Sequence, residues 1–232
     1  MRKTSFAKIL VDAILALCCA VAAASAVPTA YGTGFILSKL VFVTALCALA
    51  LSALVHLSGK LWPIPCVLFA GGAAVYFDLV RDKIETGAKL VWDGAGSLLS
   101  LSFSILPVPG EPPVTAEPEI AVTAFLIFVS AIFVLFAVIL LVKCRPTVPK
   151  LLLPLPPFVL TFIYYECRPA LFAVILLLIY WAGAVFGREK GERSSVLSER
   201  GRLLFIMLAF AVGILLPLFI PEKGFEPIPF SE

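Results

Sequence analysis

Four ionisable residues lie within or at the edge of apolar runs and are the first candidates for chemistry. They are Asp12, Lys39, Asp78 and Glu166. Because a charge inside a lipid bilayer is costly, such residues indicate a proton or ion pathway, or an internal Asp–Lys pair. Each of them, however, lies within about two turns of the end of its apolar run. The favoured interpretation is therefore an interfacial position, where a charge costs little.

His56 is the only histidine, and it is interpreted as a structural residue at the end of the second apolar run. Cys66 follows closely enough for a Cys–His nucleophile pair to be considered, but no acidic partner is evident. The six cysteines include no CxxC pair and are expected to be free apolar thiols. P-loop, dinucleotide-binding and zinc-protease motifs are absent from the sequence. The sequence thus predicts no catalytic residue, no metal site and no cofactor.

The composition is that of a membrane protein. The 232 residues are 61% hydrophobic and 14% charged, with a mean hydropathy of +1.08. Soluble domains are roughly 45–50% apolar and about 25% charged. The net charge of +3 does not favour nucleic acid as a partner. We expect an all-α, polytopic helix bundle in the cell membrane, with the lipid bilayer as its first partner.

Seven apolar runs are predicted to span the membrane. They are Ile9–Val27, Phe35–Leu57, Leu61–Val80, Ile120–Val142, Leu151–Tyr165, Ala170–Phe186 and Leu203–Ile220. The fifth is the weakest, because it is short for an apolar core of roughly 30 Å and contains three prolines. It is expected to be a distorted helix that starts as early as Thr147, with neighbouring helices compensating for the missing backbone donors.

Lys and Arg residues predict the orientation. If the N-terminus is inside the cell, most of them fall in inside segments, and the basic loop Arg188–Arg202 is the strongest anchor. Lys39 would then lie near the outer end of the second span, with its ammonium group reaching the surface. The C-terminus is predicted to be outside.

The first apolar run has two interpretations. It follows Arg2, Lys3 and Lys8, and Ala24-Ser25-Ala26 has the small-x-small pattern of a signal peptide cleavage site. However, Asp12 places a charge in the apolar region, and another span follows within about ten residues. A retained helix is favoured over a cleaved signal peptide.

The spans divide the chain into four regions. Residues 1–80 hold three spans, 81–119 form an external connection, 120–220 hold four spans, and 221–232 begin a further external segment. Within the connection, Ile84, Ala88 and Val91 share one helical face, which predicts a helix in the membrane interface with Trp92 at headgroup depth. A stiff proline-rich linker at 107–113 follows.

Small residues in two spans predict close helix packing. They are Gly71-Gly72-Ala73-Ala74 in the third span and Ala182-Gly183-Ala184 in the sixth. Internal repeats are not apparent, which weakens the interpretation as an inverted-repeat transporter.

From about Pro118 onward the order of features resembles a known family. Cys167-Arg168-Pro169 leads from a proline-rich span into another span, and the last span ends in Ile220-Pro221-Glu222-Lys223-Gly224-Phe225. This resembles the N-terminal membrane region of transglutaminase-like membrane proteins of Clostridia and related Firmicutes. In that family a helix bundle precedes an extracytoplasmic domain with a Cys-His-Asp triad. The resemblance implies a membrane anchor whose catalytic residues lie beyond residue 232.

Two main functions follow. The first is this anchor, which would hold an external domain of the same polypeptide or another membrane protein. The alternative is a small permease or transporter component, because proline-broken helices often line substrate sites. A polar cavity around Pro154–Pro157 lined by Thr161 and Tyr164 would indicate the transporter, and a packed bundle with a lipid-facing fifth helix would indicate the anchor. A third option is a membrane enzyme that uses Asp78 or Glu166 at the outer surface.

Overall fold

The structure is a computed structural model in which residues 6–103, 117–144, 146–162 and 169–186 are described. Every regular element in these ranges is a helix, so the all-α class is confirmed. Four helical stretches are long and apolar enough to cross a membrane: Phe6–Ala30, Leu37–Leu57, Gly59–Leu79 and Pro118–Lys143. Two shorter apolar stretches follow them, Val148–Thr161 and Leu171–Ala184.

Several predicted features lie outside the described residues. They are the seventh span at 203–220, the basic loop at 188–202, the linker at 107–113 and the external segment at 221–232. The number of seven spans therefore stays a prediction, while the first four, the broken fifth and the sixth fall on helices.

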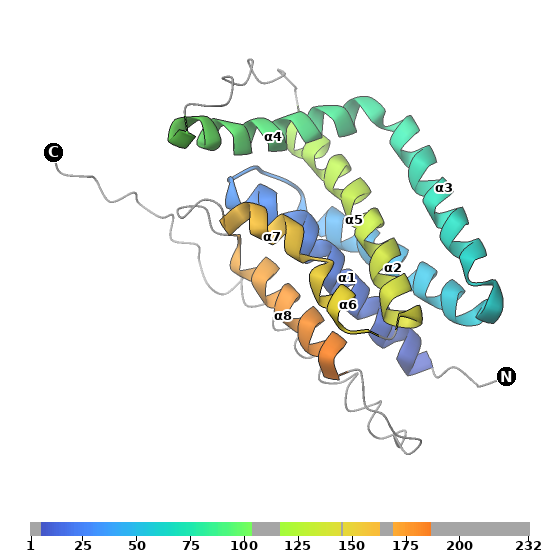
Figure 1. The fold of residues 1–232 in the computed structure, drawn as a ribbon. Helices are drawn as coiled ribbons and strands as arrows, with labels where there is room; N and C mark the ends of the chain where they lie inside the picture. Colours follow the sequence, from blue (N-terminus) through green and yellow to red (C-terminus); the bar gives the residue numbers. More distant parts are fainter. Residues whose placement is uncertain (1–5, 104–116, 145, 163–168, 187–232) are drawn as a thin grey trace.

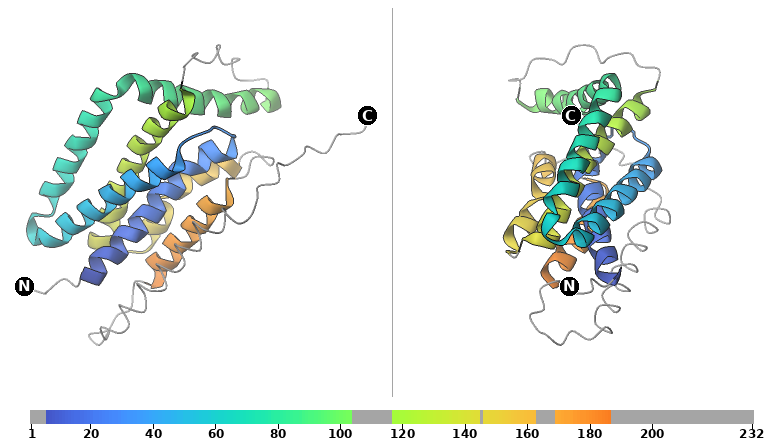
Figure 2. Two further views of the ribbon diagram at one scale, coloured as in Figure 1. Left: turned by 180° about the vertical axis from the view of Figure 1, so that it is seen from behind. Right: turned by 90° about the vertical axis from the view of Figure 1, so that its right-hand side faces the viewer.

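The helix α1 (Phe6–Ala30) lies at the centre of the bundle (Figure 1, Figure 2). Its neighbours are α2 (Leu37–Leu57), α5 (Pro118–Lys143), α7 (Leu155–Phe162) and α8 (Leu171–Phe186). Between residues 11 and 26 every side chain except that of Ile14 is buried. The stretch is rich in Ala, Cys and Ser, whose short side chains let several helices approach closely.

Helix direction alternates along the chain. The helices α1, α3 (Pro63–Leu79) and the pair α6 (Val148–Leu152) and α7 run toward one end of the bundle, and α2, α5 and α8 run back (Figure 2). A 3₁₀ turn at Gly59–Leu61 joins α2 to α3. Gly59 has a φ of 58°, a left-handed conformation that glycine adopts without steric cost.

The predicted interface helix is present as α4 (Arg81–Phe103), which lies across the end of the bundle (Figure 1). It buries Ile84, Gly87 and Val91 against the bundle, whereas the sequence had placed Ala88 on this face. Trp92 is 71% exposed, as a side chain at headgroup depth requires. The position of α4 in a membrane interface stays a prediction.

The fifth predicted span is a broken helix that begins at Val148, close to the expected start. Pro154 has no N–H, so it cannot bond the carbonyl of Lys150 four residues earlier. The Tyr180 hydroxyl of α8 donates to that carbonyl at 2.9 Å, and Trp181 Nε1 donates to the carbonyl of Leu151 at 3.1 Å. At Pro154 a neighbouring helix therefore supplies the expected compensation.

One predicted packing site is wrong and the other is confirmed. A Cβ added at Gly71 or Gly72 would meet no atom within 4 Å, so α3 makes no close helix contact there. Gly183 of α8, by contrast, faces α1 so closely that an added Cβ would lie 2.3 Å from Leu15 Cδ2. The prediction fails at the two glycines, which face open space, whereas Ala73 and Ala74 lie on the side of α3 that faces α5.

The contact between α4 and α5 predicts a specific cost for Gly87→Ala. The added Cβ would lie 2.2 Å from the carbonyl oxygen of Ala121, a backbone atom that cannot move aside alone. We expect a loss of about 1–3 kcal/mol, measured as reduced thermal stability of the purified protein in detergent micelles. Gly72→Ala is the matched control, and it should be neutral or slightly stabilising because its site is open. Equal effects of the two substitutions would contradict the close α4–α5 contact.

The proline break predicts a coupling between Pro154 and Tyr180. Tyr180→Phe removes the donor to the Lys150 carbonyl and should cost about 0.5–1.5 kcal/mol. In a Pro154→Ala background the restored N–H can bond that carbonyl, so Tyr180→Phe should cost less. Thermal unfolding of the four proteins in the double-mutant cycle measures the difference. Additive effects would show that the hydroxyl does not replace the missing backbone donor.

Candidate functional site

The clearest pair of titratable side chains joins α1 to α2. Asp12 Oδ2 lies 2.8 Å from His56 Nε2. The side chains are 12% and 4% exposed, respectively. Since a carboxylate only accepts hydrogen bonds, Nε2 is the donor in this contact. The pair links the second turn of α1 to the last turn of α2, two helices that run antiparallel.

A second polar contact supports the same junction. Ser52 lies one turn before His56 on α2, and its hydroxyl donates to the carbonyl of Ile9 on α1 at 3.1 Å. Val11 and Val55, the sequence neighbours of the Asp–His pair, are buried in the apolar core. In such surroundings a polar side chain without a partner costs about 1–3 kcal/mol, so the two contacts fix the register of α1 on α2.

The structure separates the sequence candidates instead of gathering them. Lys39 is exposed in the first turn of α2, and Asp78 is exposed near the end of α3, both at the end of the bundle opposite to Asp12. Glu166 lies outside the described residues. Asp12 is close to a helix end, as the sequence indicated, but it is buried and its partner is a histidine, not a lysine.

The acidic partner of His56 was missed at the sequence level. Asp12 and His56 are 44 residues apart, and neither local spacing nor a motif connects them. The available signal was the topology, because an antiparallel pair of spans brings the start of the first to the end of the second. Among the described residues the hydrogen bond of the His56 ring goes to Asp12, and none joins it to Cys66.

The other polar side chains of the described bundle interior are paired as well. Thr44 of α2 and Ser130 of α5 share a buried hydrogen bond of 2.9 Å. Thr123 of α5 accepts from the backbone N–H of Ile36 at 2.8 Å. Thr161, expected to line a transporter cavity, is buried and donates to the carbonyl of Phe158 at 2.7 Å in its own helix. Tyr164 lies outside the described residues.

The Asp12–His56 contact is better suited to join two helices than to catalyse a reaction. Within the described ranges no group of three or more His, Cys, Asp or Glu side chains could hold a metal ion. The five described cysteines are free thiols, namely Cys18, Cys19, Cys47, Cys66 and Cys144. What the Asp12–His56 hydrogen bond can do is bind α1 and α2 together.

A double-mutant cycle on Asp12 and His56 tests whether this hydrogen bond joins the two helices. Asp12→Ala or His56→Ala alone leaves the other side chain buried without its partner, and each should cost about 1–3 kcal/mol. The double variant should cost less than the sum by about 1 kcal/mol or more, because no orphaned partner remains. Thermal unfolding in micelles measures all four proteins. Asp78→Ala, at an exposed position, is the control and should change stability by less than about 0.5 kcal/mol. A coupling of zero would mean that the contact does not join α1 to α2.

Comparison with known proteins identifies no relative. No family model matches the chain, and no curated protein or solved structure matches it. The candidate site and the arrangement of the helices are consequently the observations on which a function for this multi-pass helical chain can be built.

Proposed function

We propose that the chain is a multi-pass membrane anchor that holds an external segment at the cell surface. The observation that carries the proposal is the fifth span. It is broken by proline, but Tyr180 donates to the Lys150 carbonyl that Pro154 frees. Trp181 donates to the next carbonyl along the chain, and Thr161 is bonded within the helix. A substrate site would need such groups to remain open, so the packing favours an anchor over a permease.

The outward faces of the helices support contact with lipid. Large apolar side chains cover them, among them Phe42, Leu46, Leu54, Val67, Leu68 and Val75. Val159 and Leu160 give α7 the same apolar outer surface, while Phe158 and Thr161 face the bundle. Soluble monomers rarely expose apolar patches of this extent, whereas a bilayer accepts them.

The basic residues of the whole sequence support an N-inside orientation. Lys8, Lys60, Lys143 and Lys150 lie at the end of the bundle where α1 begins and α8 ends (Figure 2). In the sequence, the basic residues 188–202 directly follow α8. Because Lys39, Arg81, Lys83 and Lys89 lie at the opposite end of the bundle, the excess of basic residues on the proposed cytoplasmic side depends on 188–202 and on the N-terminal segment. A span at 203–220 would then return the chain to the outside.

The identity of the external domain is the part of the proposal that rests on the sequence alone. Residues 220–225 resemble the end of the membrane region in transglutaminase-like membrane proteins. We infer that residues 221–232 lead into an external domain of this kind. Reading the source gene past codon 232 tests the inference: an open frame with a globular Cys-His-Asp domain supports it, and a stop codon contradicts it.

Reporter fusions test the anchor and its orientation. Alkaline phosphatase is active only outside the cytoplasm, and green fluorescent protein is fluorescent when fused inside. We expect phosphatase activity for fusions after Phe103 and Glu232, and fluorescence for fusions after Lys143 and Arg202. The opposite pattern would reverse the orientation. A chain that washes off membranes at alkaline pH would contradict the anchor itself.

A further inference from the structure

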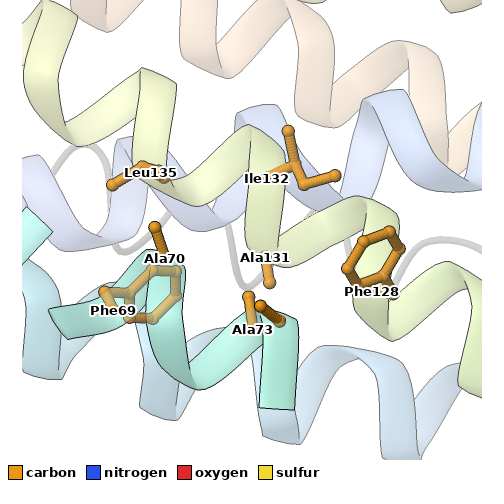
Figure 3. Close-up of a pocket in the computed structure, with 8 residues that line it drawn as sticks. Phe69, Ala70, Ala73, Phe128, Ala131, Ile132 and Leu135 are labelled. Carbon is orange, nitrogen blue, oxygen red and sulfur yellow. The ribbon is translucent and has the colours of Figure 1, made fainter. Parts of the chain in front are cut away.

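An apolar groove of about 170 Å³ lies between α3 and α5 (Figure 3). Its walls are Phe69, Ala70 and Ala73 of α3 and Phe128, Ala131 and Leu135 of α5. The groove exists because the alanines of the two facing helices are too short to fill the space between them. These residues belong to the middle turns of both helices, so the groove lies at the depth of the acyl chains if the helices span a bilayer.

The segments that flank the groove also touch near each of its ends. At one end the rings of Phe77 and Phe128 are in tilted contact, with their centroids 5.2 Å apart. At the other end Lys143 Nζ donates to the carbonyl of Gly59 at 3.3 Å and lies 5.5 Å from the centroid of the Trp62 ring. A transmembrane helix is about 10 Å wide and is too large for a volume of about 170 Å³. A single hydrocarbon chain fits it.

Positive charge is concentrated at the second end. Lys143 ends α5, and Lys60 is exposed on the adjoining 3₁₀ turn. Lys143 is two helical turns beyond Leu135, or about 12 Å along the helix, a distance that an acyl chain covers. Trp62 beside Lys143 marks this level as the membrane interface, where tryptophan is enriched. Basic side chains at the mouth of an apolar groove are the combination that binds anionic lipid headgroups.

We propose that the groove and the two lysines form a binding site for one anionic phospholipid of the adjacent leaflet. An acyl chain lies between Ala73 and Ala131, and the phosphate lies between Lys60 and Lys143. The proposed lipid site rests on the membrane insertion proposed above but not on the identity of the external domain. It would fix α3, the least buried of the long helices, against α5 through a lipid.

Native mass spectrometry of the full chain tests the site with phosphatidylglycerol and phosphatidylcholine added in equal amounts to detergent micelles. We expect one retained phosphatidylglycerol per chain and a preference of about 25-fold, since each of the two lysines near the headgroup adds about fivefold. Lys60→Gln/Lys143→Gln should abolish the preference, and the glutamine amide keeps a donor for the Gly59 carbonyl. Lys8→Gln/Lys39→Gln removes the same charge elsewhere and should leave the preference unchanged.

A second pair of variants tests the groove. Ala73→Phe fills it and should release the lipid, whereas Ala50→Phe on the exposed face of α2 should not. If Ala73→Phe unfolds, Ala70→Leu at the groove wall replaces it. The proposal is overturned if the wild-type chain retains both lipids equally, or if Ala73→Phe still retains phosphatidylglycerol. A dimer mass that disappears in Ala73→Phe also overturns it, because the groove would then bind a second copy of the chain. Loss of the chain from membranes at alkaline pH would instead refute the proposed anchor. Failure of the lipid site and failure of the anchor therefore give different results.

Discussion

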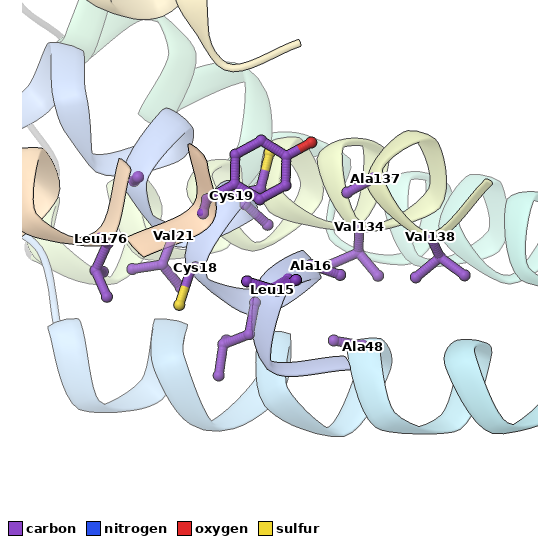
Figure 4. Packing of buried hydrophobic residues seen from close by; sticks show 14 of the residues in the cluster. Leu15, Ala16, Cys18, Cys19, Val21, Ala48, Val134, Ala137, Val138 and Leu176 are labelled. Carbon is purple, nitrogen blue, oxygen red and sulfur yellow. The ribbon is translucent and has the colours of Figure 1, made fainter. Parts of the chain in front are cut away.

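The burial of α1 is the constraint on which the rest of the bundle depends. In a bilayer, helices gain little from the hydrophobic effect between them and associate through close packing. Four helices, α2, α5, α7 and α8, pack around the stretch from Val11 to Ala26, because its small side chains let all of them approach closely. Figure 4 shows Leu15, Ala16 and Cys18 within this packing, with Val134 and Val138 of α5 beside them.

Polar side chains then fix which faces meet. His56 and Ser52 of α2 bond to Asp12 and the Ile9 carbonyl of α1, and Thr44 of α2 bonds to Ser130 of α5. On the other side of α1, the Tyr180 hydroxyl donates to the Lys150 carbonyl at the proline break and also interacts with the Cys19 thiol. These contacts satisfy groups that lipid cannot satisfy, so they specify helix register more than they add stability.

The sequence predicted what depends on hydropathy and proline chemistry. The first four long apolar helices were placed within a few residues, and the broken fifth helix and a helix in the connection at 81–119 were expected. It could not predict contacts that depend on rotation about helix axes. Asp12 and His56 were assigned separately because 44 residues lie between them, and Gly71 was assigned to an interface although its side is open. Hydropathy reports that a helix is buried or in lipid, but not which face meets which neighbour.

The pattern at Ala24-Ser25-Ala26 makes the central position of α1 directly testable. The three residues are buried within the bundle, and their small size, which resembles a cleavage site, is what the packing of α1 requires. The most direct measurement is the intact mass of the full-length chain after purification from membranes. We expect a mass that includes α1. A folded, monodisperse protein whose first residue is Val27 would show that the bundle forms without α1 and would contradict its role as the central helix.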